Sequence, residues 1–212
     1  MPHADHQYLA PGFMATLVWL TVLGAIGLVG GNIVGSIVVP NHDFVADTVS
    51  DLAAGRYEII QDVSLYGFAI SLVALGLASA HVHNGVTRWS LLTFCLVLLA
   101  LCVVIIGARN EYGDGDNEGI VIHIYIVYVL GILFTAVFAL MAMEGGRIAS
   151  FMRPLSWICL ALWAIAAPIF FILPTEWDGI WERGLGIITV VWTLGYAIAL
   201  RQFAQEHRDE TR

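Results

Sequence analysis

The residues with the clearest chemical potential are a serine, an aspartate and a histidine that lie among long apolar runs. Ser50 and Asp51 follow the first apolar run, and His123 lies about one helical turn inside the fourth. An ionisable side chain within a membrane segment is costly and is often functional. His123 is therefore a candidate catalytic residue, and we predict that Ser50 and Asp51 act with it. A structural hydrogen bond from His123 to a neighbouring helix is the alternative.

Two carboxylates are expected at the same depth as His123. Asp62 opens the second apolar run, and Glu182 opens the sixth. One histidine with such carboxylates could hold a divalent metal ion or relay protons. In the metal version, the predicted ligands are Asp62, His123 and Glu182.

Three aspartates precede these residues at helical spacing. Asp43, Asp47 and Asp51 fall at i, i+4 and i+8, so on one helix they would share a face. Like charges at this spacing repel each other and need compensation. Water and salt, a bound divalent cation, or an arginine such as Arg109 or Arg183 could supply it.

Membrane helices must position these side chains. Hydrophobic residues make up 59% of the 212-residue chain and charged residues only 12%, against about 25% charged in soluble domains. Six runs are long enough to cross about 30 Å of hydrocarbon. We predict an all-α integral membrane protein, a six-helix bundle forming one domain over residues 1–212, with a short amphipathic helix between the first two spans. The expected spans are 13–39, 63–82, 89–108, 119–143, 154–173 and 184–200.

The charges predict an orientation in the membrane. Six of the nine arginines fall on the side that holds both termini, which should be cytoplasmic in the cell membrane: Arg88, Arg147, Arg153, Arg201, Arg208 and Arg212. Twelve of the seventeen acidic residues fall on the opposite, outer side, which should attract cations: Asp43, Asp47, Asp51, Glu58, Asp62, Glu111, Asp114, Asp116, Glu118, Glu176, Asp178 and Glu182.

Two further features bear on partners and chemistry. Gly27, Gly31 and Gly35 form a small-residue stripe on the first span, where another helix of this chain or of a second copy could approach closely. The expected partners are membrane lipids and this second copy, with no nucleic acid. The chain has no lysine, which excludes a lysine Schiff base and a Walker-type phosphate site.

Three stretches carry a family resemblance. They are ADTVSDLAAG at Ala46–Gly55, IIQDVSLYGFAISLVALGLA at the opening of the second span, and IVIHIYIVYVLG around His123. The chain resembles the uncharacterised bacterial and archaeal membrane-protein family catalogued as domain of unknown function 998. The resemblance implies a six-helix or similar bundle without an established activity, and Ser50, Asp51 and His123 match positions of its pattern.

Three functional interpretations remain open at this level. The first is a membrane protein of unassigned activity with a polar site near His123 on an acidic outer side. The second is a metal-dependent membrane hydrolase of a lipid-like substrate, by analogy with ceramidase-like and adiponectin-receptor-like enzymes, although those use three histidines around zinc and this chain has one suitably placed. The third is a small transporter or sensor that binds cations.

Overall fold

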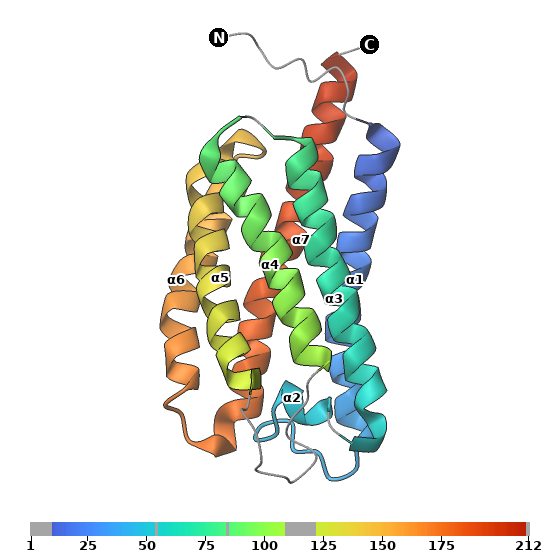
Figure 1. Cartoon of the computed structure of the whole chain (residues 1–212), viewed down its shortest axis with the longest axis vertical. Coiled ribbons are helices and arrows are strands. Elements are labelled where there is room, and N and C mark those ends of the chain that lie inside the picture. Colours follow the sequence, from blue (N-terminus) through green and yellow to red (C-terminus); the bar gives the residue numbers. More distant parts are fainter. Residues whose placement is uncertain (1–9, 54, 84, 109–121, 211–212) are drawn as a thin grey trace.

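The computed structural model describes residues 10–53, 55–83, 85–108 and 122–210, which form helices and connecting turns without a strand among them (Figure 1). Six of the helices are long and apolar enough to cross a membrane. The α-helices are α1 (Pro11–Val38), α2 (Val49–Leu52), α3 (Glu58–His81), α4 (Thr87–Ala108), α5 (Ile122–Glu144), α6 (Met152–Phe170) and α7 (Asp178–Glu210). Short 3-10 turns lie at Gly55–Tyr57, Gly145–Arg147 and Thr175–Trp177. The predicted six-span, all-α fold with a short helix after the first span is confirmed.

Several helix ends differ from the predicted spans. Helix α3 begins at Glu58 rather than at 63, and α7 runs over 33 residues instead of the predicted 184–200. Backbone hydrogen bonding continues through charged residues, so a helix need not end where hydrocarbon ends. Helix α6 stops at Phe170, short of 173, as expected close before Pro174. Residues 109–121, with Arg109 and the acidic residues between 111 and 118, lie outside the described residues.

The six long helices form a closed ring in chain order. Helix α1 packs against α3 and α7, and each later helix packs against the next one. The beginning of α1 and the end of α7 lie at one end of the bundle, called the termini end below, while α2 lies at the other, the α2 end (Figure 1). A hydrogen bond of 3.1 Å from the Ala10 amide to His81 Nε2 ties α1 to α3 at the termini end.

The interior of the ring is mostly apolar, and several of its buried polar side chains are hydrogen-bonded. Leu72, Leu96 and Phe138 are fully buried, as is Trp192. The Trp192 indole N–H donates to Ser156 Oγ at 3.0 Å. Large apolar side chains also cover the outside of the helices, as expected where the surrounding medium is hydrocarbon rather than water.

Glycines bring α1 and α3 into close contact. A Cβ atom at Gly24 would collide with the carbonyl oxygen of Gly67, and one at Gly31 would collide with the Ser64 side chain. Gly27, between them, has nothing within 4 Å, and Gly35 has only ordinary contact with Leu52. Within the stripe, Gly31 therefore packs against α3 of the same chain. Binding of a second copy at the uncovered Gly27 stays a prediction.

Replacing Gly24 with alanine should destabilise the bundle, because the new methyl group meets rigid backbone on α3. Overpacking of this kind costs about 1–3 kcal/mol, seen as a lower melting temperature in detergent. Gly27→Ala is the matched control on the same helix and should melt like wild type or slightly higher. Equal melting of both variants would contradict the close contact.

Candidate functional site

The segment between α1 and α2 is a chain of turns rather than one helix. The chain leaves α1 and reverses at Asn41, whose φ of 59° is left-handed, a conformation that asparagine tolerates. Asp43 and Asp47 lie before α2, which spans only four residues. The prediction that Asp43, Asp47 and Asp51 share one helical face is wrong, because side-chain bonds to backbone amides compete here with helix formation.

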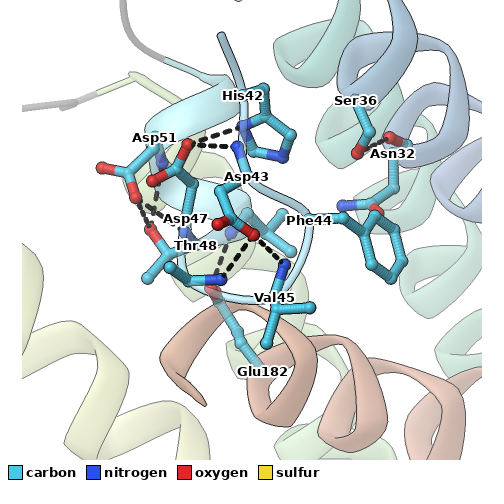
Figure 2. Close-up of polar contacts among 12 residues, drawn as sticks. Asn32, Ser36, His42, Asp43, Phe44, Val45, Asp47, Thr48, Asp51 and Glu182 are labelled. Atoms are coloured by element: carbon cyan, nitrogen blue, oxygen red, sulfur yellow. Dashed lines mark hydrogen bonds and ion pairs between the residues drawn. The ribbon is translucent and has the colours of Figure 1, made fainter. Parts of the chain in front are cut away.

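Each of these aspartates caps a neighbouring part of the backbone (Figure 2). Asp43 Oδ1 accepts from the amides of Val45 and Ala46 at 2.9 and 3.3 Å, and these bonds lower the pKa of Asp43 below its usual range. Asp47 Oδ2 accepts from the Asp43 amide at 2.8 Å. Backbone donors thus supply part of the compensation that the clustered carboxylates require.

Thr48 and Asp51 form a capping box around α2. Thr48 Oγ1 accepts from the Asp51 amide at 3.1 Å, and Asp51 Oδ2 accepts from the Thr48 amide at 2.6 Å and from its hydroxyl at 2.7 Å. Such reciprocal bonds fix where a helix begins. Asp51, predicted as catalytic, holds the backbone that carries Ser50 in this arrangement.

Arg183, in the second turn of α7, binds this segment to the bundle. Its Nη1 donates to the carbonyl oxygens of Phe44 and Asp47 at 3.0 and 2.8 Å. Its Nε donates to Asn32 Oδ1 at 3.0 Å, and its Nη2 lies 3.4 Å from Ser36 Oγ, so two acceptors come from α1. The guanidinium also lies over the Phe44 ring, 4.2 Å from its centroid.

His42 completes the surroundings of the guanidinium. Arg183 Nη2 is 2.9 Å from His42 Nε2, and since arginine can only donate, that ring nitrogen accepts. The proton is then on Nδ1, which lies 3.3 Å from Asp47 Oδ2. Burial, followed by the charge of Arg183, lowers the pKa of His42 below its usual value, consistent with the neutral ring.

The segment also pairs directly with the backbone of α7. The amides of Gly179 and Ile180 donate to the carbonyls of Ala46 and Val45 at 3.1 and 3.0 Å. A Cβ atom at position 179 would collide with the Asp47 carbonyl oxygen. The close approach therefore requires a glycine there.

Glu182, which directly precedes Arg183 on α7, fixes the start of α2. Its Oε2 accepts from the Val49 amide at 2.7 Å (Figure 2). A carboxylate at the first helical amide satisfies a donor that has no partner within the helix. Glu182, predicted as a metal ligand, is engaged here in placing the residue before Ser50.

These contacts bring Ser50 against His123. Ser50 Oγ lies 3.2 Å from His123 Nε2, across 73 positions of the chain. His123 is 5% exposed and comes from the first turn of α5. Two of the three predicted catalytic residues are thus in hydrogen-bond contact.

A cavity of about 560 Å³ opens beside the Ser50–His123 pair. Its apolar wall comes from α5 and the end of α6: Ile124, Val127, Phe170 and Phe171. Five carboxylates also line it, from the segment before α3, from the 3-10 turn before α7 and from the start of α7: Asp47, Asp51, Glu176, Asp178 and Glu182. His123 is the basic residue of this lining, so the cavity combines an acidic side with an apolar side.

Asp62 is not among the residues that line the cavity. Asp62 Oδ1 and both polar atoms of the adjacent Gln61, which is 0% exposed, are buried without a hydrogen-bond partner among the described residues. Within the described ranges, no three His, Cys, Asp or Glu side chains are grouped closely enough to share a metal ion. The side chains predicted as metal ligands therefore do not form a recognisable metal site.

The family model described as "Protein of unknown function (DUF998)" matches residues 22–199, which is most of the chain. The chain belongs to the DUF998 family. The match takes in all the site residues described above, from Asn32 to Glu182 and Arg183. Neither a curated protein nor a solved structure matches this DUF998 protein.

Sequence reasoning found some parts of this DUF998 site and missed others. The sequence indicated Arg183 only as a possible counter-charge to the aspartates, whereas in this segment it donates to backbone carbonyls and to His42. His42 and Gly179 were not singled out. A glycine in the first turn of a helix, directly after the charged Asp178, was the available signal for close backbone contact at Gly179.

Arg183→Lys should loosen the segment before α2, because a single ammonium cannot reproduce the planar fork that joins α1, this segment and α7. Hydrogen bonds to charged groups contribute about 1.5–3 kcal/mol each, so the melting temperature should fall clearly. Arg56→Lys is the control at the same end, since Arg56 is exposed and its guanidinium lies over the ring of the adjacent Tyr57. Equal melting of the two variants would contradict the role given to Arg183.

Proposed function

We propose that this protein is a membrane-embedded hydrolase in which Ser50 is the nucleophile and His123 the general base. The observation that carries the proposal is the 3.2 Å contact between Ser50 Oγ and His123 Nε2 at the wall of a cavity. A serine becomes nucleophilic when an adjacent base can take its proton. The pair lies at the α2 end, where a substrate could enter from the membrane surface.

In the proposed reaction, Ser50 Oγ attacks the carbonyl carbon of an ester, and its proton passes to His123 Nε2. His123 returns that proton to the leaving alcohol as the ester bond breaks, which leaves an acyl-serine. Water then attacks the acyl group, again with His123 as base, and releases the acid and free Ser50. The carboxylates around the cavity stabilise the transient imidazolium.

The cavity lining supports a lipid-like substrate. Phe170, Phe171 and Val127 offer an apolar wall for an acyl chain. The carboxylates on the other side favour a head group without net negative charge. Together these features fit an ester that is partly embedded in the membrane.

A second serine–histidine pair lies in hydrogen-bond contact, but its histidine cannot act as a base toward the serine. Ser90 Oγ lies 2.7 Å from His83 Nε2 at the termini end. His83 Nδ1 accepts from the Gly85 amide at 2.9 Å, so in the neutral ring Nε2 carries the proton and donates to Ser90. That histidine nitrogen cannot accept the serine proton, which makes this pair a built-in comparison for Ser50 and His123.

A metal-dependent hydrolase has less support from the contacts in this site than a hydrolase that uses the Ser50–His123 pair. Glu182 Oε2 is bonded to the Val49 amide, and Asp62 does not line the cavity. The acidic lining of the cavity would suit cation binding by a transporter or sensor, but the apolar core packed between the two ends of the bundle does not favour transport.

A fluorophosphonate probe should label Ser50 in the purified protein, because it reacts with serines that an adjacent base activates. Ser50→Ala should abolish labelling, and His123→Ala should slow it by about 100-fold or more. Ser90→Ala, the matched control, should label like wild type. Labelling that persists in Ser50→Ala, or no labelling of a wild-type protein that melts cooperatively, would contradict the proposal.

For orientation, we propose that the α2 end faces outward from the cell membrane and that both termini are cytoplasmic. Two features support this. Arg88, Arg147 and Arg153 lie near the termini end, where arginine favours the cytoplasmic side. The cavity carboxylates lie at the other end.

A single cysteine placed at Trp177 should react with an impermeant maleimide added to intact cells, and one placed at Ser150 should react only after lysis. Both positions are exposed in the protein, and the three native cysteines are buried. The opposite pattern would reverse the orientation.

A further inference from the structure

A groove of about 260 Å³ lies between α1 and α7 near the termini end. It is separate from the cavity beside Ser50, which lies at the opposite end of the bundle. On α1, Met14, Val18 and Val22 line it at four-residue spacing, so they follow one face of the helix. These residues extend along roughly 12 Å of the helix axis, and the groove therefore runs lengthwise into the membrane.

Arg201 and Gln205 line the α7 side of the same groove. They are one turn apart and both are exposed. Arg201 is the first charged residue after the apolar run 184–200, which places it at the depth of the lipid head groups. The groove thus has an apolar floor and one cationic residue where head groups begin.

Arg201 differs from Arg88 and Arg147 in its surroundings. Arg88 and Arg147 lie 3.4 and 3.1 Å from the buried carboxylate of Glu144. Among the described side chains, no carboxylate lies within ion-pair distance of Arg201. As far as the described side chains go, its charge is available to an anion from the surroundings.

We propose that this groove binds one anionic phospholipid from the leaflet at the termini end. An acyl chain lies along Met14, Val18 and Val22, and the phosphate binds the Arg201 guanidinium, with the Gln205 amide as a second donor. The planar fork of arginine suits a phosphate, which it can bind through two parallel hydrogen bonds. The proposal rests on the groove and its charge and is independent of the Ser50–His123 site.

The test reconstitutes the full chain in vesicles of equal parts phosphatidylglycerol and phosphatidylcholine, extracts it in mild detergent, and measures retained lipid by native mass spectrometry. The wild-type protein should retain one phosphatidylglycerol in preference to phosphatidylcholine. Arg201→Gln should reduce that preference about tenfold, the loss expected for one charge-assisted contact. Ala15→Phe, which fills the groove and keeps the charge, should reduce retention of both lipids.

Arg153→Gln is the matched control, because Arg153 is exposed at the same end but lies on α6, away from the groove. It should retain lipid as the wild type does. Equal retention by wild type and a folded Arg201→Gln protein would overturn the proposal. An equal loss in Arg153→Gln would also overturn it, because general attraction between charges would then explain the preference.

Discussion

The α2 end of this molecule depends on the placement of one arginine. Arg183 projects from α7 into a group of acceptors contributed by α1 and by the segment that follows it: Asn32, Ser36, His42, Phe44 and Asp47. A buried guanidinium is costly unless its donors are satisfied, and so are buried carbonyl oxygens. Each side satisfies the other, so the segment keeps one position. The Ser50–His123 contact depends on that position, since Ser50 follows this segment directly.

The fold was predictable from the sequence because the bilayer imposes simple rules. Long charge-free runs can only be helices in hydrocarbon, and all six were found. Their ends were less accurate, as at Glu58 and Glu210, because helical hydrogen bonding does not stop at the membrane surface. The helical spacing of Asp43, Asp47 and Asp51 predicted one helix that carries all three, and this prediction failed for a different reason. Their carboxylates bond backbone amides nearby, and these local bonds break up the helix that the spacing indicates.

The candidate site was predictable only where side-chain type and depth were informative. His123 stood out because a polar group at the head of a span needs a partner, and Ser50 because it lies beside the aspartates. The two side chains lie together. The contacts that position them were not predictable. Glu182 binds the amide of Val49, and Arg183 binds the carbonyls of Phe44 and Asp47. Backbone atoms are the same at every residue, so no pattern of side chains indicates which of them will be chosen.

The order of the helices in the chain gives the Arg183 contacts a consequence for biosynthesis. The residues they join are 136 to 151 positions apart, and α7 leaves the ribosome after the six described helices that precede it. Helices α1 and α3 can pack as soon as both are inserted, since they are neighbours in the chain and in space. The segment between them has no guanidinium to bind until α7 arrives. The contacts that hold the serine against the histidine are therefore complete only once α7 has been synthesised and inserted.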